Sequence, residues 1–322
     1  MDSNTLYGKA FGCLAGLAIG DAMGRPAEGK TIEYIRQTYG TIEGFVSDDV
    51  SGTDDTEYAM LCAHTLIEGR GIISYESVTR QWLDHLCTQE PLPRGGESEV
   101  WAIQNLLRGM VAPISGSDNT RSYSDGAAMR IAPVGIVCAG KPYRAARLAA
   151  VESAVSHAGD GIYCAQAIAA GVAAAMVGAR VDEIIHTALE VLPVDCWSRR
   201  WIVRGLSIAQ RYNSPLAAAE ALHQELMTGY AATAPEAVAQ ALAVFKLAEG
   251  DPRQAIVASC NVGRDADTIA AMAGALAGAL HGVEALPADW VDKTRKVKGV
   301  RLRFTTGWDI GDVARQLVEL IP

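Results

Sequence analysis

The chain has 322 residues, of which 49% are apolar and 20% are charged, and its formal net charge is −9 with a pI near 5.2. This charge excludes the usual nucleic-acid-binding protein, which presents a basic face, but it allows an anionic small molecule whose charge a bound metal ion offsets. A chain of this length can bury about three quarters of the surface that its unfolded form exposes, so a large core is possible.

Helical periodicity dominates the sequence from one end to the other. Several helices have recognisable starts, such as Ser74 followed by Ser77, or Pro235 and Pro252 in a first helical turn. The predicted helices cover residues 5–21, 31–38, 55–69, 75–87, 98–109, 127–139, 142–155, 161–178, 181–190, 198–211, 215–228, 235–249, 252–261, 267–281 and 309–320. Sustained apolar–polar alternation is nearly absent, and the best strand candidate is TIEGFV at 41–46. We therefore expect an all-α fold with a single domain over residues 1–322.

Two groups of glycines repeat every four residues: Gly12, Gly16 and Gly20, and Gly274, Gly278 and Gly282. Glycine inside a helix costs about 1 kcal/mol relative to alanine, so a glycine stripe indicates a close backbone approach to a neighbouring helix. If the two helices pack antiparallel, the end of the first, at Asp21, meets the start of the second, at Asp265. We predict this pairing.

Cysteine usage and the N-terminal residues indicate the compartment. The seven cysteines are scattered and have no CxxC spacing, which fits reduced thiols in a cytosol. The first ten residues contain an acid at position 2 and no continuous apolar run, so we expect no signal peptide. Residues 161–179 are uncharged but rich in Ala and Gly, which favours a buried helix over a membrane span. We expect a cytoplasmic protein with no membrane partner and no nucleic-acid partner.

An unusual acidic segment, SGTDDTEYAM, places Thr53, Asp54 and Asp55 directly before a predicted helix. No Lys or Arg lies between residues 48 and 68, so nothing nearby in the sequence neutralises these acids. One interpretation is capping, because Asp and Thr are favoured N-caps and an acid near a helix N-terminus gains about 0.3–1 kcal/mol from the dipole. The other interpretation is a cation site.

A second cluster, with Asp265, Asp267 and Thr268, precedes another predicted helix and favours the cation site. One Asp is enough to cap a helix, and buried like charges raise each other's pKa unless a cation joins them. Oxygen donors without His or Cys suit Mg²⁺ or Mn²⁺ better than Ca²⁺. Donors shared between two ions leave positions open for water and substrate, as metal-assisted hydrolysis requires. We predict two Mg²⁺ ions, with Mn²⁺ as an alternative.

Five segments occur in an order that resembles the ADP-ribosylglycohydrolases: GCLAGLAIGDAMGRPAEG, TDDTEYAM, SDGAAMRIAPVGI, SHAGDGIYCAQA and NVGRDADTIAAMAGALAGALHG. The similarity spans about residues 8–283, and the combination of TDDT with a distant DxDT before a Gly-rich helix is specific. Enzymes of this family remove ADP-ribose from proteins, and they include the dinitrogenase-reductase-activating glycohydrolase. The resemblance implies an all-helical orthogonal bundle with a binuclear Mg²⁺ or Mn²⁺ centre in a cleft.

The metal ligands that the resemblance implies are Thr53, Asp54, Asp55, Asp265, Asp267 and Thr268. The family's acidic residue after its Gly-Asp motif matches Glu28, which implies a carboxylate that handles a substrate hydroxyl or the attacking water near the scissile bond. Without the resemblance, Glu28 is simply an exposed loop residue. Cleavage at the ribosyl C1″ develops an oxocarbenium-like centre, which such a carboxylate can stabilise.

The residues predicted to contact the substrate are Gly95, Gly96, Ser98, Ser124, Asp125, Gly126, His157 and Arg264. Residues 95–98 precede a helix whose free N–H groups can bind a phosphate, although a plain loop and cap fits equally well. Residues 124–126 match the family's loop that contacts ribose and phosphate. His157 matches a position near the ligand, whereas a lone His is more often structural.

Two positions depart from the family's pattern. Asp125 stands where many relatives carry Asn, and a negative charge beside a diphosphate is unfavourable by about 1 kcal/mol or more. Arg264 stands where Gly or Asp is frequent, and we expect it to pair with Asp125 or Glu28 or to bind an anionic group of the substrate. Both positions concern substrate recognition and leave the metal donors intact.

The predicted function is that of a metal-dependent glycohydrolase that cleaves an N- or O-ribosyl bond of an ADP-ribosylated protein or a small ADP-ribose conjugate. One alternative is a hydrolase of a smaller ribosylated metabolite, such as a nucleoside or nucleotide. Another is a binding or structural protein, since the family includes lens crystallins. The complete set of metal donors together with Glu28 argues against this last alternative.

Overall fold

The computed structural model describes residues 2–322, and within them the chain forms 18 α-helices and no strand. The all-α prediction is therefore confirmed. The helices are α1 Ser3–Gly24, α2 Ile32–Tyr39, α3 Asp54–Glu68, α4 Tyr75–His85, α5 Glu97–Leu107, α6 Ile114–Ser117, α7 Gly126–Arg130, α8 Ala132–Val137, α9 Pro142–Ser153, α10 Asp160–Ala175, α11 Val181–Glu190, α12 Trp197–Ala209, α13 Pro215–Leu226, α14 Ala234–Leu247, α15 Pro252–Cys260, α16 Ala266–His281, α17 Ala288–Thr294 and α18 Ile310–Val318. Three short 3₁₀ turns, Arg25–Ala27, Val283–Ala285 and Arg303–Thr305, connect some of them.

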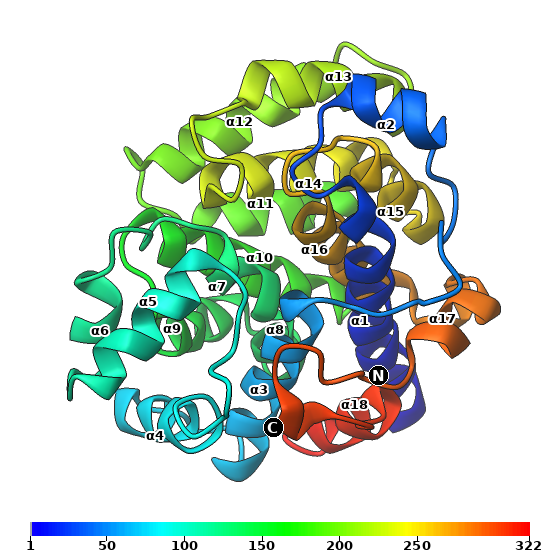
Figure 1. The fold of residues 1–322 in the computed structure, drawn as a ribbon. Coiled ribbons are helices and arrows are strands. Elements are labelled where there is room, and N and C mark those ends of the chain that lie inside the picture. Colours follow the sequence, from blue (N-terminus) through cyan, green and yellow to red (C-terminus); the bar gives the residue numbers. More distant parts are fainter. Residues whose placement is uncertain (1) are drawn as a thin grey trace.

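Helices α1 and α16 lie side by side near the middle of the molecule and form its most extensive helix–helix interface (Figure 1). They run antiparallel, because Gly12 faces Gly278, Gly16 faces Gly274 and Gly20 faces Ala270. A Cβ atom added at Gly12 would lie 2.5 Å from the carbonyl oxygen of Gly278, so only glycine allows the backbones to approach this closely. The predicted pairing of the glycine stripes is confirmed, and it brings the end of α1 to the start of α16.

A half-buried lysine connects α1 to the ends of two other helices. The ammonium of Lys9 donates to Leu280 O at 2.5 Å and to Ala279 O at 3.3 Å, both in the last turn of α16. It also donates to Ala175 O, the end of α10, at 3.2 Å. A cation at this point satisfies helix carbonyls that have no partner within their own helix. Lys9 therefore fixes α10 and α16 against α1.

The strand predicted over residues 41–46 is wrong. This segment is a loop, and the N–H and C=O of Ile42 bind the side-chain amide of Asn261 at 3.0 and 2.9 Å. A strand needs a neighbouring strand to pair its backbone groups, and here a side chain takes that role. The short apolar alternation reflects the burial of Ile42.

The single helix predicted over residues 127–139 is also wrong, because α7 ends at Arg130 and α8 begins at Ala132. Pro133 lies in the first turn of α8. Proline has no N–H to continue the hydrogen-bond ladder of α7, but it is well tolerated where a new helix begins.

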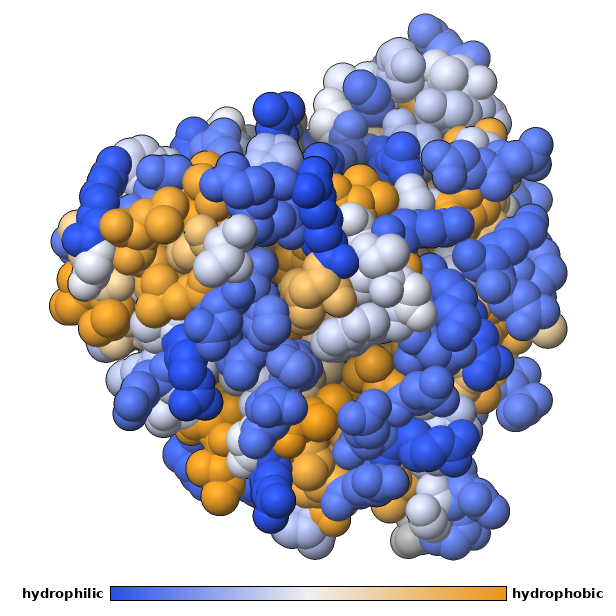
Figure 2. All heavy atoms as spheres, turned by 60° about the horizontal axis from the view of Figure 1, so that its bottom comes forward, coloured by the Kyte–Doolittle hydropathy of each residue, from blue (hydrophilic) through white to orange (hydrophobic). Residues whose placement is uncertain are grey.

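Apolar side chains gather in patches between hydrophilic ones on the face shown in Figure 2, which is the lower end of Figure 1. Exposed apolar residues near α4 and α6 include Ile72, Val111 and Ile114. Tyr75 and Val111 line a groove that shares no lining residue with the acidic cleft described below. Among the helices of residues 2–322, none combines the length and the apolar character needed to cross a membrane.

Candidate metal and substrate site

A cleft with a volume of about 350 Å³ lies where the N-terminal parts of α3, α5, α7 and α16 meet, and we call it the acidic cleft. Its lining contains eight carboxylates but only two cationic side chains. The lining residues are Glu28, Asp54, Asp55, Arg94, Gly95, Gly96, Glu97, Glu99, Ser124, Asp125, Gly126, Met129, Tyr230, Ala232, Asp265, Asp267, Thr268 and Arg301. The predicted residues Thr53, Ser98, His157 and Arg264 are not among them.

The N-terminus of α3 is capped by a residue of another helix, Asp21 of α1. The buried carboxylate of Asp21 accepts hydrogen bonds from the backbone N–H of Thr53 at 2.8 Å and of Thr56 at 3.0 Å. It also accepts the hydroxyls of both threonines, at 2.8 and 2.5 Å. Because Asp21 satisfies these donors, neither Asp54 nor Asp55 is needed as a cap. Thr53 has the N-cap position and Asp54 and Asp55 lie in the first turn, but the Thr53 side chain makes no capping hydrogen bond.

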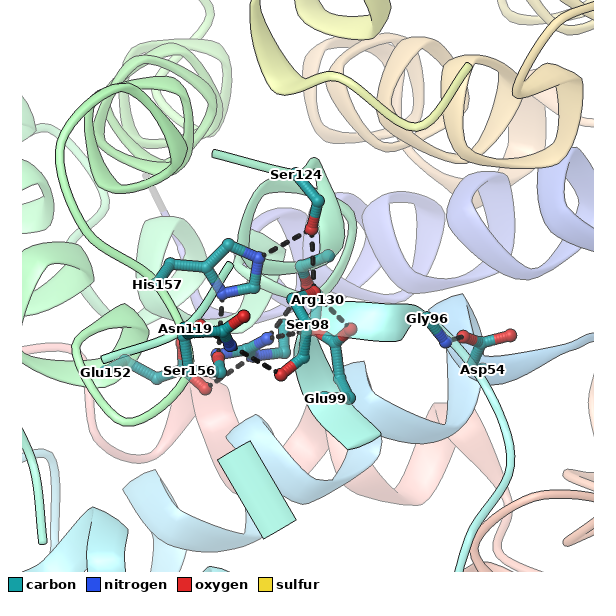
Figure 3. Close-up of polar contacts among 11 residues, drawn as sticks. Asp54, Gly96, Ser98, Glu99, Asn119, Ser124, Arg130, Glu152, Ser156 and His157 are labelled. Carbon is teal, nitrogen blue, oxygen red and sulfur yellow. Dashed lines mark hydrogen bonds and ion pairs between the residues drawn. The ribbon is translucent and has the colours of Figure 1, made fainter. Parts of the chain in front are cut away.

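Asp54 and Asp55 are directed to different neighbours. Asp54 accepts the N–H of Gly96 at 2.8 Å, which joins the start of α3 to the start of α5 (Figure 3). A Cβ atom at Gly95 would lie 2.7 Å from an Asp54 oxygen, so the loop before α5 is a close fit around this carboxylate. Asp55 is buried, and one of its oxygens lies 3.2 Å from the Thr53 hydroxyl. The glycines predicted to bind phosphate thus also position Asp54.

The second acidic cluster lines the same cleft, at the start of α16. Asp265 is the N-cap residue, but its side chain accepts no capping hydrogen bond. Asp267 and Thr268 follow in the first turn, and all three residues are buried. The positions are therefore those of a capped helix, but the capping hydrogen bond is not made here either. The antiparallel contact of α1 with α16 brings this cluster to the one on α3.

The carboxylates are close enough together to hold divalent cations. Oxygens of Asp21, Asp55 and Asp267 lie within 4.8 Å of one another, as do oxygens of Glu28, Asp265 and Asp267. Asp55 Oδ1 and Asp267 Oδ1 are buried and have no hydrogen-bond partner. An unpartnered buried carboxylate oxygen is costly unless a cation or a proton joins it. This donor set, all oxygen, fits Mg²⁺ or Mn²⁺.

Burial and mutual repulsion raise the pKa of these carboxyl groups. Desolvation is the larger cause for Asp55, Asp265 and Asp267, and the neighbouring carboxylates add to it, so each pKa lies well above its usual range. Desolvation also raises the pKa of Asp21, to about 6, although the Thr56 and Thr53 donors oppose it. Glu28 is less enclosed, yet desolvation followed by the charge of Asp54 raises its pKa. A bound cation would reverse these shifts.

Asp125 belongs to the acidic cluster itself. Its side chain is buried beside Asp265, and its Oδ2 has no hydrogen-bond partner. Desolvation, followed by the charge of Asp55, raises its pKa well above the usual range. Its backbone N–H donates to Ala232 O at 3.1 Å, which fixes the start of α7. The predicted Asp125 therefore adds an oxygen donor to the region where cations fit.

The expected pairing of Arg264 with Asp125 or Glu28 is wrong. The Arg264 guanidinium binds both carboxylate oxygens of the buried Glu236, at 2.5 and 3.1 Å, and donates to Thr228 O at 2.9 Å. Glu236 also accepts the N–H of Thr228, so this ion pair fixes the loop that carries Tyr230 to the cleft wall. The fully buried partner explains the pairing, because a charge inside the protein must be compensated.

A polar chain behind the cleft connects the remaining predicted residues (Figure 3). The Ser98 hydroxyl lies 2.6 Å from Glu99 and 2.7 Å from the Ser124 hydroxyl, which in turn lies 3.0 Å from Nε2 of His157. Burial, followed by the charge of Arg130, holds the pKa of His157 well below its usual range, so the ring is neutral. Ser98 and His157 thus support Ser124, which lines the cleft.

This series of hydrogen bonds ends at a buried cation, Arg130. Arg130 has no exposed side-chain surface and binds Glu99 and Glu152, each at 2.9 Å. It also donates to the Ser156 hydroxyl at 2.9 Å, and this hydroxyl lies 2.7 Å from Nδ1 of His157. These contacts join α5, α7 and α9 beneath the cleft (Figure 3).

The structure also brings to the site residues that were not predicted from the sequence, which include Asp21, Arg94, Tyr230 and Arg301. Of these four, Asp21 has a signal in the sequence, because it directly follows the glycine repeat that places α1 against α16. Tyr230 and Arg301 lie in loops, where no helical periodicity reports on which side a residue faces.

Comparisons with known proteins find similarity over nearly the whole chain. A family model described as ADP-ribosylglycohydrolase matches residues 2–321. An uncharacterized protein of Archaeoglobus fulgidus is 30% identical over 88% of this chain and 90% of its own length. ADP-ribosylarginine hydrolase Tri1 of Pseudomonas putida is 28% identical over 88% of this chain and 74% of its own length. A solved structure described as an ADP-ribosylglycohydrolase-related protein complex has the same fold, with a TM-score of 0.70 at 21% identity, over 99% of this chain and 100% of that chain.

Proposed function

Because the chain belongs to the ADP-ribosylglycohydrolase family and is a glycoside hydrolase, we propose that it is a divalent-metal-dependent enzyme acting on an N- or O-linked ADP-ribose. The substrate is an ADP-ribosylated protein or a small ADP-ribose conjugate. The observation that carries this proposal is the group of buried, unpartnered carboxylate oxygens of Asp55, Asp125 and Asp267 in one cleft.

The residues that would hold two Mg²⁺ or Mn²⁺ ions are Thr53, Asp54, Asp55, Asp265, Asp267 and Thr268. Asp54 has one oxygen bound to Gly96, and its other oxygen remains for a cation. Asp21 holds Thr53 in position, and partners of this kind orient metal ligands in proteins. Bound ions of this type supply positive charge that orients substrate oxygens and stabilises negative charge as it develops.

Glu28 is the proposed catalytic carboxylate. It lines the cleft, and its carboxylate lies within reach of Asp265 and Asp267, on the exposed side of the cluster. A raised pKa suits a group that exchanges a proton with water or a ribose hydroxyl near neutral pH. As a carboxylate it also stabilises the positive charge that develops at C1″ during cleavage.

Gly95, Gly96, Ser124 and Gly126 are proposed to contact the substrate, since each lines the cleft. Ser124 is held by Ser98 and His157, so its hydroxyl has a fixed position toward the ligand. Ser98 and His157 then act through Ser124 rather than on the substrate directly. Arg264 acts on the cleft wall through Glu236.

A liquid-chromatography assay tests the proposal with ADP-ribosyl-arginine, ADP-ribosyl-serine, O-acetyl-ADP-ribose and free nucleosides. Each compound is incubated with Mg²⁺, with Mn²⁺ and with EDTA, and Asp54→Ala protein purified in parallel controls for contaminating hydrolases. We expect ADP-ribose to be released from at least one conjugate with a divalent ion and from none with EDTA. Turnover of nucleosides alone would overturn the substrate class, and undiminished turnover in EDTA would overturn the metal dependence.

A further inference from the structure

Arg301 is one of two cationic side chains in the acidic cleft. Glu28 lines the same cleft, and the positive charge of Arg301 opposes the rise in the pKa of that carboxyl group. The other cation, Arg94, is an exposed residue of the loop before α5. Arg301 is better enclosed and is therefore the stronger candidate for a defined contact.

The backbone around Arg301 is fixed by a carboxylate of α3. Glu57 accepts the N–H groups of Val300, Arg301 and Leu302 at 2.5, 2.6 and 2.5 Å. The carbonyl of Arg301 accepts the side-chain amide of Gln89 at 2.8 Å. Glu57 lies on the same helix as Asp54 and Asp55, so the position of Arg301 is tied to that of the acidic cluster.

The Arg301 side chain has unused hydrogen-bonding capacity. Its Nε–H is buried and has no partner, although eight carboxylates line the same cleft. Within residues 2–322, the hydrogen bonds that Arg301 makes come from its backbone N–H and C=O. A guanidinium presents a rigid fork of donors that matches a planar or tetrahedral oxyanion, and a buried donor without a partner is costly.

The charge of the cleft also favours such a contact. ADP-ribose carries a diphosphate, and the carboxylates lining the cleft repel it even where cations offset part of their charge. Arg301, whose backbone is held by Glu57, supplies a positive charge in this cleft that attracts the diphosphate. The substrate can then enter with its anionic group directed to Arg301.

We propose that Arg301 is a specificity-determining residue that binds an oxyanion of the substrate beside Glu28, held in place by Glu57. The inference rests on the proposed function, since it names a contact within the same cleft. Two groups offer this chemistry: the diphosphate of ADP-ribose and a carboxylate on the leaving group.

The first measurement is calorimetric binding of ADP-ribose in the presence of Mg²⁺ to wild-type, Arg301→Gln, Arg301→Lys and Arg303→Gln proteins. Arg303 is the matched control, because it lies in the same segment, is exposed and does not line the cleft. If the diphosphate is the oxyanion, Arg301→Gln raises Kd about tenfold or more, Arg301→Lys raises it less, and Arg303→Gln leaves it unchanged. The melting temperature of each variant shows whether it is folded.

The second measurement compares kcat/KM for ADP-ribosyl-arginine and ADP-ribosyl-agmatine, which differ by one carboxylate. If the leaving-group carboxylate is the oxyanion, Arg301→Gln abolishes a wild-type preference for the arginine conjugate and leaves the Kd of ADP-ribose unchanged. The effect falls on KM, with kcat changed by less than about threefold, because the contact positions substrate rather than stabilising charge at C1″.

The inference is overturned if wild-type protein binds ADP-ribose and hydrolyses a conjugate but Arg301→Gln alters neither measurement. The proposed function fails separately if wild-type protein binds ADP-ribose in an Arg301-dependent way but hydrolyses no conjugate. Wild-type protein that neither binds ADP-ribose nor hydrolyses a conjugate overturns both.

Discussion

The carboxylate of Asp21 is placed where it serves both the fold and the site. It caps α3 through Thr53 and Thr56, and it lies within 4.8 Å of oxygens of Asp55 and Asp267. Because it takes over capping, Asp55 keeps a free oxygen. The cost is a third buried acid in a small volume, which destabilises the protein when no cation is bound.

Replacing Asp267 by Asn tests this balance. We expect Asp267→Asn to lose Mg²⁺ binding and turnover, because it removes a carboxylate shared by both acid groups. In EDTA, the same variant should be more stable than wild type, by about 1 kcal/mol or more, since a buried like charge disappears. Urea unfolding in EDTA and calorimetric Mg²⁺ titration measure the two effects. Asp289→Asn, at an exposed position, is the control. If Asp267→Asn protein is less stable than wild type in EDTA, this contradicts the interpretation that the buried acids destabilise the metal-free protein.

Replacing Glu28 by Gln separates chemistry from metal binding. Glu28→Gln keeps the shape of the side chain but cannot exchange a proton, so kcat should fall about 100-fold or more. Mg²⁺ affinity should change less than in Asp267→Asn, because Glu28 lies in only one of the two acid groups. Single-turnover assays and Mg²⁺ titration check this, and unchanged turnover would remove the proposed role of Glu28.

At the scale of elements, the site depends on how closely α1 approaches α16. A Cβ atom at Gly16 would overlap the backbone of Gly274, and backbone atoms cannot move aside as a flexible side chain can. Gly8, in the same helix, has no atom within 4 Å of its Cβ position. The two glycines therefore form a matched pair in one helix.

We expect Gly16→Ala to lower the free energy of unfolding by about 2 kcal/mol or more and to weaken Mg²⁺ binding, because α16 must move away from α1. Gly8→Ala should raise stability by up to about 1 kcal/mol, since alanine is the better helix former. Urea unfolding of both variants measures the difference. Equal stability of the two proteins would show that the close approach is not needed.

The sequence predicts elements well where the signal is local. Helix α11 is predicted with its observed bounds of 181–190, and α15 begins at Pro252 as expected from proline in a first turn. The break between α7 and α8 is missed, because apolar periodicity continues across it and only Pro133 marks it. The strand over 41–46 is wrong because burial of Ile42 by itself produces apolar alternation.

The site is predictable to the extent that its residues lie beside each other in the sequence. Asp54, Asp55, Asp265 and Asp267 form compact motifs, and the structure places all four in the acidic cleft. Arg301 is missed because its position depends on Glu57, which is 244 residues earlier in the chain. The partner predicted for Arg264 is also wrong because its actual partner is distant in the sequence. Arg264 lies in the loop before α16, and Glu236 lies on α14.

For the molecule as a whole, the raised pKa values of several clustered carboxyl groups make stability depend on pH. In the unfolded chain these groups lose their protons near pH 4. In the metal-free folded chain, burial raises the pKa of Asp21 to about 6 and those of Asp55 and Asp267 well above the usual range. The folded state therefore holds more protons than the unfolded state, so stability falls as pH rises from about 4 through these folded pKa values.

Thermal unfolding at several pH values tests this. In EDTA, we expect the melting temperature to fall between pH 5 and pH 7.5. With Mg²⁺ in excess, the trend should flatten or reverse, because the ions bind the deprotonated carboxylates and stabilise the folded state. An EDTA melting temperature that rises with pH over this range would show that the acidic cluster does not dominate.

The pairing of α1 with α16 also has a consequence for biosynthesis. Helix α1 ends at Gly24 and α16 begins at Ala266, so a chain that is still being translated carries one half of the site long before the other half exists. During that time the glycine face of α1 has no partner, and Asp55 lacks the neighbouring carboxylate of Asp267. We therefore expect hydrolysis only after the ribosome has released the segment that contains α16, so that an incomplete chain cannot act on a substrate.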